Sequence, residues 1–387
     1  MQKNERIREK AILVYPVVGK GSFGDWQADF EELKELVRSA DLDLVDEEVV
    51  FLKEVNPKTL IGKGKLEELH GRAHALGVDI AVLGVNTSPS KERNIEDALG
   101  VPIVDRTQLI LGIFAKRARS KEGKVQVELA QLRDLLPRLS GKGRQLSRLG
   151  GGIGTRGPGE KKLEVDRRRI GARIHSLKQD LKDVERHRRL QRGSLRREAF
   201  PLLAIIGYTN AGKSSLFNLL THAHVVAEDK LFATLDPTVR RVRLPSKQEA
   251  LLVDTVGIIR DMPENLLQAF RATFEDFEQA DAYIHVVDGS QPKYRAKIEE
   301  VTDVLGKLGL LGKPVLFAIN KSDLIHSEKF SLEEDLKRQA VVISSKTGEG
   351  IPKLIESMEG LLETLAAMPS TKGGAIGSSR DSDVLAF

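Results

Sequence analysis

The chain of 387 residues contains no cysteine. This absence excludes disulfide bonds, zinc sites built on thiolates and a thiol nucleophile. The sequence also has no apolar run near the roughly 18 residues of a membrane-spanning helix. Its first ten residues, MQKNERIREK, are polar or charged almost throughout and lack the apolar core of a signal peptide. We therefore expect a cytoplasmic protein without a membrane span, and the length favours two or three domains.

Net positive charge is confined to one central segment. The formal net charge of the whole chain is +5, but Lys116 to Glu198 contains 25 Lys or Arg and 10 Asp or Glu, a local charge of +15. Such a concentration predicts a polyanionic partner, with nucleic acid as the first candidate and an anionic membrane surface as the second.

Alternating strand and helix patterns surround this basic segment. Residues 1–120 predict a small parallel α/β domain, and residues 199–367 predict one doubly wound α/β domain. The tail, residues 368–387, is rich in Ser, Gly and charge and is expected to be disordered. In the first domain we expect strands at Ala11–Val18, Leu44–Leu52 and Asp79–Gly84, and helices at Asp25–Ser39, Lys65–Leu76 and Lys91–Leu99.

The basic segment, residues 121–198, has helical periodicity instead. Two apolar stripes with steps of four and three residues predict a helical hairpin packed as a short antiparallel coiled coil, with Pro137 ending the first helix. The first stripe is Val125, Leu129, Leu132, Leu136 and Leu139; the second is Ile170, Ile174, Leu177, Leu181 and Val184.

A glycine-rich loop, Gly141–Glu160, joins the two helices and is called the tip loop below. Eight of its 20 residues are glycine and four are basic: Lys142, Arg144, Arg148 and Arg156. Either it is a solvated linker, or these four cations contact RNA phosphates, with the helix Lys161–Arg197 as the alternative contact.

The stretch Gly207–Ser214 reads GYTNAGKS and is called the phosphate loop below. It follows an apolar strand candidate, Pro201–Ile206, and precedes a helical stretch, as a G-x-x-x-x-G-K-S nucleotide site requires. Its glycines allow a tight turn, Lys213 reaches the β and γ phosphates, and the Ser214 hydroxyl can coordinate Mg²⁺. The residues expected to bind nucleotide here are Gly207, Tyr208, Thr209, Asn210, Ala211, Gly212, Lys213, Ser214 and Ser215.

Three further motifs stand at the ends of strand candidates. In DTVG, Asp254 is the candidate Mg²⁺ carboxylate and the Gly257 N–H is placed to sense the γ-phosphate. In NKSD, the Asp323 carboxylate matches the two N–H donors of guanine. Asn320 would brace the base and the neighbouring loop, and the stem of Lys321 could cover the face of the base. The third motif is SSK, and a backbone N–H from its residues Ser344, Ser345 and Lys346 could meet guanine O6.

Together these motifs resemble the translation-factor-related GTPases. The resemblance picks Thr234 as the second Mg²⁺ ligand, with Thr238 as its competitor, and gives Lys213, Thr234 and Gly257 catalytic roles. At Ser345 that family usually has Ala. In related potassium-activated GTPases the position of Asn210 ligates K⁺; here Asn210 either does so or only bonds the loop.

The stretches Gln126–Gly141 and Gly151–Arg168 narrow the resemblance to HflX-type GTPases, over roughly residues 10–367. Two features differ from the family pattern. Lys161 replaces the polar residue that usually follows RGPGE, and no folded domain is expected after the GTPase domain. The resemblance implies a GTP hydrolase that binds the large ribosomal subunit and its rRNA. Such a protein is expected to act as a monomer and to help release or split stalled or idle ribosomes. The alternatives are a GTP switch assisting ribosome assembly or RNA modification, and a membrane-surface GTPase.

Other patterns compete with this interpretation. Gly19–Gly24 reads GKGSFG, which fits either a second nucleotide site or an ordinary strand-to-helix turn. His70 and His74 have a metal-ligand spacing without the Glu of an HExxH motif. Ile258 follows DTVG where many relatives have a water-orienting glutamine, so we expect slow hydrolysis by the protein alone.

Overall fold

A computed structural model describes residues 8–19, 26–139, 158–195, 200–223, 230–254, 256–260, 262–263, 266–267, 275–325, 332 and 334–367. The chain divides into two compact units, Met1–Asp183 and Val184–Phe387, and the boundary falls within helix α7 (Pro158–Leu195). Each unit contains a β-sheet with helices packed on it, so the predicted α/β class is confirmed.

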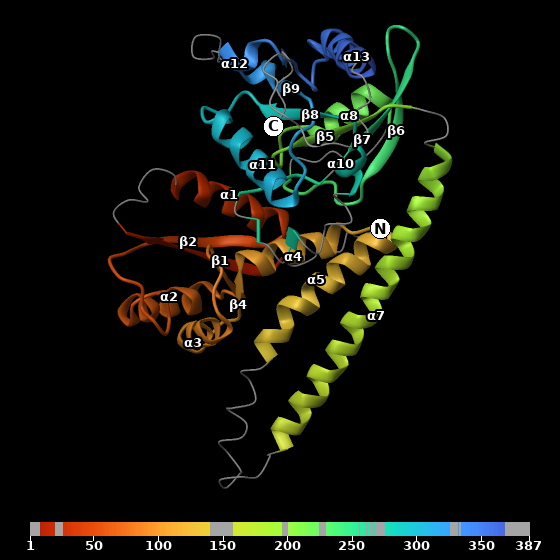
Figure 1. The fold of residues 1–387 in the computed structure, drawn as a ribbon. Helices are drawn as coiled ribbons and strands as arrows, with labels where there is room; N and C mark the ends of the chain where they lie inside the picture. Colours follow the sequence, from red (N-terminus) through yellow and green to blue (C-terminus); the bar gives the residue numbers. More distant parts are fainter. Residues whose placement is uncertain are drawn as a thin grey trace, which may run out of the picture. The chain divides into compact units, whose positions relative to one another are not determined.

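The sheet of the first unit is parallel and has the strand order β2-β1-β3-β4 (Figure 1). Seven consecutive residues of β1 are buried, because helices cover both faces of a parallel sheet, and this explains the unbroken apolar run Ala11–Val17. The three predicted strands are confirmed, whereas the sequence analysis did not name the short fourth one. The bounds are Lys10–Val18 for β1, Asp43–Leu52 for β2, Ile80–Leu83 for β3 and Ile103–Asp105 for β4.

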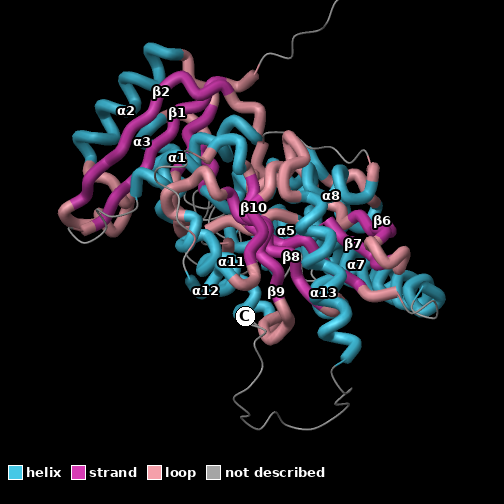
Figure 2. Tube along the Cα trace, turned by 90° about the horizontal axis from the view of Figure 1, so that it is seen from above, coloured by secondary structure: helices cyan, strands magenta, loops and turns pink. Residues whose placement is uncertain are grey.

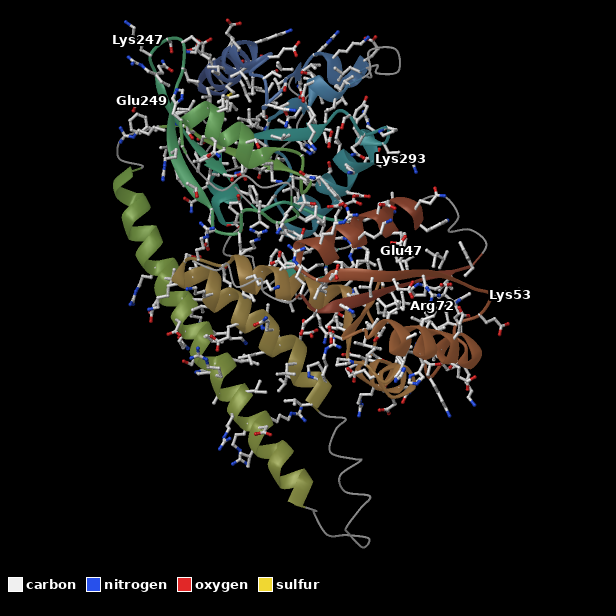
Figure 3. All side chains as sticks on the ribbon, turned by 180° about the vertical axis from the view of Figure 1, so that it is seen from behind. Glu47, Lys53, Arg72, Lys247, Glu249 and Lys293 are labelled. Atoms are coloured by element: carbon white, nitrogen blue, oxygen red, sulfur yellow. The ribbon has the colours of Figure 1, made fainter. Side chains whose placement is uncertain are left out.

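Helices α1 (Trp26–Ser39) and α4 (Arg106–Arg117) contact each other, as do α2 (Lys63–Leu76) and α3 (Pro89–Leu99) on the other face of the sheet (Figure 1). Leucine and isoleucine side chains of α2 and α3 join those of the strands in one core cluster. Arg72 of α2 binds the carboxylates of Asp46 and Glu48 on β2, and Figure 3 shows it beside that strand.

Helix α5 (Lys121–Leu139) packs along α7, as the hairpin prediction requires. Val125 and Leu129 form a buried cluster with Leu177 and Leu181, and Leu132 and Ile174 pack against it. Residues near the start of α5 contact residues near the end of the α7 segment that belongs to the first unit. The two helices are therefore antiparallel, as predicted. The tip-loop residues 141–157, with all four predicted RNA-binding cations, lie outside the described residues.

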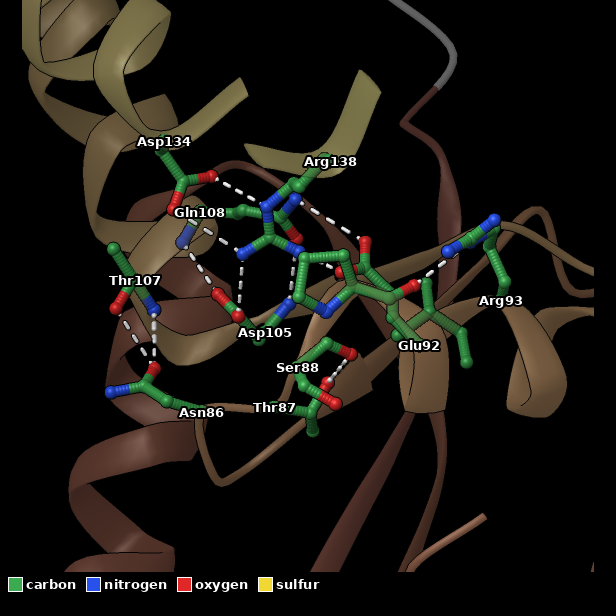
Figure 4. Close-up of polar contacts among 12 residues, drawn as sticks. Asn86, Thr87, Ser88, Glu92, Arg93, Asp105, Thr107, Gln108, Asp134 and Arg138 are labelled. Carbon is green, nitrogen blue, oxygen red and sulfur yellow. Dashed lines mark hydrogen bonds and ion pairs between the residues drawn. The ribbon is translucent and has the colours of Figure 1, made fainter. Parts of the chain in front are cut away.

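The prediction that Pro137 ends the first helix is wrong by two residues, because α5 continues to Leu139. A proline ring removes one hydrogen bond to the preceding turn, and other contacts can offset that loss. The residue that follows, Arg138, makes such contacts. Its guanidinium binds Glu92 of α3, Asp105 at 2.8 Å and Asp134 at 2.8 Å, and the four residues are called the Arg138 cluster below (Figure 4).

The sheet of the second unit has the order β10-β9-β8-β5-β7-β6, in which only the pair β6–β7 is antiparallel. Its strands lie side by side in Figure 2, and helices α8 and α13 pack on it through a common cluster of buried apolar residues. The bounds are β5 Leu202–Gly207, β6 Thr238–Arg243, β7 Glu249–Asp254, β8 Ala282–Asp288, β9 Val315–Asn320 and β10 Ala340–Val342.

The helices of the second unit connect these strands. They are α8 Lys213–Thr221, α10 Glu275–Gln279, α11 Tyr294–Leu308, the 3-10 turn η4 Ser322–Leu324, α12 Glu334–Lys337 and α13 Ile351–Ala367. Because β5, β7 and β9 are aligned in the same sense, the residues that follow them meet at one edge of the sheet. The phosphate loop, DTVG and NKSD therefore come together there.

Candidate functional site

The phosphate loop turns sharply between β5 and α8, and two glycines make the turn possible. Gly207 has a φ of 144°, and a Cβ there would lie 2.3 Å from the carbonyl oxygen of Val286. Gly212 has a φ of 95°, and its Cβ would lie 2.2 Å from Nδ2 of Asn320. Any larger residue at either position would displace the backbone. The loop thus ends at the N-terminus of α8, where unpaired N–H groups favour an anion.

Lys213 is the first residue of α8 and is only 6% exposed. Its ammonium donates a hydrogen bond to the carbonyl of Tyr208 at 2.7 Å, across the loop. Burial lowers the pKa of Lys213 to about 8, although the charge of Asp254 partly opposes this. A bound polyphosphate would stabilise the ammonium form at this position.

Thr209 also faces the cavity beside this loop. Its hydroxyl oxygen is buried and has no hydrogen-bond partner among the described residues. A buried hydroxyl without a hydrogen-bond partner costs free energy, so a ligand that supplies a partner is favoured here. An oxygen of a bound phosphate is such a partner. Asn210, at the same loop, has a φ of 60° and is exposed at the wall of the cavity.

Three oxygen-bearing side chains meet at the start of α8. The Ser214 hydroxyl donates to Oδ2 of Asp254 at 2.8 Å, and its oxygen lies 2.7 Å from Oγ1 of Thr234. Asp254 is completely buried at the end of β7. Two hydroxyls and one carboxylate form the hard oxygen set that Mg²⁺ prefers. The competitor Thr238 begins β6 instead, opposite Asp254 in the strand register.

The segment after DTVG is attached to the phosphate loop through its backbone. The Ile258 N–H donates to the carbonyl of Gly207 at 3.1 Å, and its carbonyl accepts from the Thr209 N–H at 2.8 Å. The Tyr208 hydroxyl accepts from the N–H of Arg260 at 2.8 Å. A Cβ on Gly257 would lie 2.7 Å from Thr209 and 2.9 Å from the Lys213 ammonium, so a side chain has no room there.

Ile258 itself is 1% exposed. Its side chain is therefore both apolar and buried, and it can neither bond nor position a water molecule at the phosphate. Tyr208 and Ala211, which the sequence analysis expected to bind nucleotide, are also buried. The side chain of Tyr208 contacts the Gly257–Arg260 segment and lies 4.8 Å from the Lys297 ammonium. Gly207, Tyr208 and Ala211 are not among the described residues that line the cavity.

The residues expected to bind guanine form a network around Asn320, which is 2% exposed. Asn320 donates to the carbonyl of Ala211 in the phosphate loop at 2.8 Å. Residues Ser344–Lys346, called the base loop below, follow β10. The Ser344 hydroxyl donates to Oδ1 of Asp323 at 2.6 Å, which fixes that carboxylate before any base arrives. The Lys321 ammonium binds Asp288 at 2.7 Å, and the prediction that its stem covers the base stays a prediction.

The cavity at this edge of the sheet also has walls that the sequence analysis missed. Lys230, Phe232 and Ala233 line it together with the expected Thr234. No motif marks these residues, although their place just before Thr234 was a usable signal. Lys230 and Lys213 are the charged residues among those described as lining the cavity. The described residues that line the cavity are Thr209, Asn210, Gly212, Lys213, Ser214, Ser215, Lys230, Phe232, Ala233, Thr234 and Gly257.

The competing patterns of the sequence lead to no second site in the described residues. His70 places Nδ1 2.8 Å from the carbonyl of Leu99, and the described part of the chain has no group of three or more His, Cys, Asp or Glu residues that could hold a metal ion. Most of Gly19–Gly24 lies outside the described residues. Among the helices that the structure describes, none has the length and hydropathy needed to cross a membrane.

Three family models match consecutive parts of the chain. They describe a GTP-binding GTPase N-terminal domain (residues 27–115), a GTP-binding GTPase middle region (residues 117–194) and a 50S ribosome-binding GTPase (residues 202–321). The chain is also 47% identical to GTPase HflX of Caldanaerobacter subterraneus subsp. tengcongensis, over 93% of this chain and 82% of that protein. It is 41% identical to GTPase HflX of Escherichia coli K12, over 85% and 78%.

Among solved structures, the complex of SsGBP with GDP is similar to this chain. The two are 26% identical with a TM-score of 0.50, and the match covers 92% of this chain and 99% of that one. The similarity therefore extends over both units and not only over the cavity-bearing sheet.

Proposed function

The chain belongs to the HflX family of GTPases and is a GTP hydrolase, and on that premise we propose that it binds the large ribosomal subunit and promotes the dissociation or rescue of stalled or idle ribosomes. The observation that carries the proposal is the segment Lys116–Glu198 with its net charge of +15. Ribosomal RNA is a polyanion, and cations that neutralise its phosphates gain affinity by releasing counterions.

Exposed cations on α7 support an RNA-facing role for the hairpin. Only apolar residues of α7 enter the buried cluster with α5. The exposed basic residues of the described part of α7 are Arg167, Arg168, Arg169, Arg173, Lys178, Lys182 and Arg186. In this proposal the tip-loop cations Lys142, Arg144, Arg148 and Arg156 make the deepest contacts. The protein works as a monomer with four parts: residues 1–120, 121–198, 199–367 and the tail 368–387.

The chemistry proposed for the cavity is attack of water on the γ-phosphate without a covalent intermediate. Ser214, Thr234 and Asp254 would hold Mg²⁺, which neutralises charge on the β and γ phosphates when bound. Lys213 adds a second charge there, and the Gly257 N–H faces the γ-phosphate. Asp323 selects guanine, because adenine lacks its pair of N–H donors. The base and phosphate contacts are those of the residues expected from the sequence: Gly207 to Ser215 at the phosphates, and Asn320, Lys321, Asp323, Ser344, Ser345 and Lys346 at the base.

Hydrolysis by the protein alone is slow in this proposal, because the buried Ile258 supplies no group that orients water. Ribosome binding would order what is missing, and charge stabilisation of that kind is worth roughly 10³-fold or more in rate. Asn210 would hold K⁺ as an added positive charge at the phosphates. Equal hydrolysis rates in KCl and NaCl at the same ionic strength would remove K⁺ from the proposal.

Sucrose-gradient sedimentation of intact ribosomes tests the main proposal. With the protein and a GTP analogue we expect the protein to move with the large subunit and the intact ribosome peak to decline. The Ala variant of the four tip-loop cations should lose both effects while its affinity for the GTP analogue stays unchanged. Binding without any loss of the intact peak would favour a GTP switch for ribosome assembly or RNA modification instead.

A further inference from the structure

Asn320 connects the base loop to the phosphate loop, and Ser345 holds it at one end. The carbonyl oxygen of the Asn320 side chain accepts two hydrogen bonds from Ser345, from the N–H at 2.9 Å and from the hydroxyl at 2.9 Å. The amide nitrogen of the same side chain donates to the carbonyl of Ala211 at 2.8 Å. One buried amide group thus joins two loops that are over 100 residues apart.

The hydroxyl bond adds to what the backbone already provides. With Ala at position 345, only the N–H could reach the asparagine. Asn320 is 2% exposed, so water cannot easily replace the second bond if the hydroxyl is removed. The hydroxyl bond therefore acts on a side chain whose position affects both loops.

The Asn320 side chain packs closely against the phosphate loop, so a movement of Asn320 would also move that loop. A Cβ at Gly212 would lie 2.2 Å from Nδ2 of Asn320, so the amide lies directly against the turn that precedes Lys213. The same loop holds the Ala211 carbonyl in the hydrogen bond. A shift of Asn320 would consequently disturb the backbone groups that face the phosphates.

We propose that the Ser345 hydroxyl is a positioning group that ties the base loop to the phosphate loop through Asn320 and thereby slows nucleotide release. This inference rests on the proposed guanine site around Asp323. A neutral hydrogen bond of this kind changes an equilibrium by about two- to tenfold. The Ser345→Ala variant should therefore release GDP about two to ten times faster than the wild-type chain.

The test measures dissociation of a fluorescent GDP analogue from the full-length protein by stopped flow. Ser322→Ala is the matched control, because Ser322 lies two residues from Asn320 but donates its hydroxyl to Glu349 at 3.0 Å. We expect faster release from Ser345→Ala only, with a nucleotide-free melting temperature equal to that of the control. Release at the wild-type rate, or equal acceleration in both variants, would overturn the proposal.

Tripolyphosphate, which has no base, shows whether the effect crosses to the phosphate loop. Its affinity should fall in Ser345→Ala and stay unchanged in Ser322→Ala. A loss confined to GDP would mean that Ser345 acts on the base loop alone, and the tie would be refuted. Failure of the guanine site is a separate result, since the wild-type chain would then bind ADP as tightly as GDP.

Discussion

Removing the charge of Arg138 should destabilise the first unit strongly. The Arg138 cluster contains three carboxylates and one guanidinium, and their side chains are between 2% and 15% exposed. Arg138→Met keeps an unbranched apolar stem, shorter than arginine by the guanidinium group, and leaves Glu92, Asp105 and Asp134 without their shared cation (Figure 4). The substitution therefore removes the positive charge and its hydrogen bonds from the cluster.

The size of the effect follows from burial. Loss of one partner of a buried ion pair costs about 3–5 kcal/mol, because the remaining charge is desolvated and uncompensated. Asp105 keeps some compensation, since it accepts backbone hydrogen bonds from Gln108, at 2.9 Å to its Oδ1, and from Thr87 and Thr107. Burial already raises the pKa of Asp105. Without Arg138 we expect the carboxylates to bind protons more easily, so the loss of stability should be smaller at pH 5 than at pH 8.

Urea unfolding followed by tryptophan fluorescence measures this loss. The chain has a single tryptophan, Trp26, which lies in α1 of the first unit and contacts the ring of Phe51, so its signal reports that unit. The control is Arg173→Met, which removes an exposed pair with Glu128 and should lower the stability far less, because water screens this pair. If Arg138→Met unfolds at the same urea concentration as this control, the cluster does not stabilise the unit as argued.

Three further predictions concern the second unit. Asp323→Asn should lose GTP and gain xanthosine triphosphate in a competition assay, with a cost of about 1.5–3 kcal/mol for GTP; wild-type protein that binds ATP as tightly as GTP would contradict this. Lys230→Gln should weaken GTP binding about tenfold in a titration, by loss of one charge-assisted contact, whereas Lys247→Gln on the exposed β6–β7 turn (Figure 3) should change nothing; equal affinities would exclude Lys230 from the site. His285 is buried on β8, where burial and the charge of Lys213 lower its pKa to about 3; the folded state therefore resists protonation while the unfolded state takes up a proton below pH 6.5. Stability should fall by about 2 kcal/mol from pH 7 to pH 5, measured by urea unfolding with circular dichroism, and a His285→Phe variant with the same slope would refute the assignment.

The sequence predicted what depends on short patterns. Three of the four strands of the first sheet and the central residues of the two hairpin stripes follow from apolar periodicity, and the three strands are at most a few residues from their observed bounds. The phosphate loop, DTVG and NKSD were expected at strand ends because their spacing is local. Thr234 was chosen over Thr238 by resemblance alone, and the structure places its hydroxyl beside Ser214.

Contacts between distant residues were not predictable in this way. Lys230 carries no motif, and only its position in the folded chain brings it to the cavity. The salt bridge between Lys321 and Asp288 joins the NKSD motif to the end of β8, 33 residues earlier in the chain, and no local pattern marks Asp288 as its partner. A second hydrogen bond from Ser345 could not be seen because the backbone was expected to do all the work there.

The continuation of α5 past Pro137 shows how such distant contacts bear on function. By local rules the helix should stop at the proline, yet the next residue binds carboxylates from α3 and from the start of α4, which lie 33 or more residues earlier in the chain. These contacts fix the last turn of α5 on the N-terminal sheet. The tip loop begins two residues after that turn in the sequence, so the helix end that leads to it is held by the rest of the first unit. In the proposed function, in which the tip loop contacts RNA, a fixed helix end reduces the conformational freedom lost on binding. Arg138→Met should accordingly weaken ribosome binding even under conditions in which the first unit remains folded.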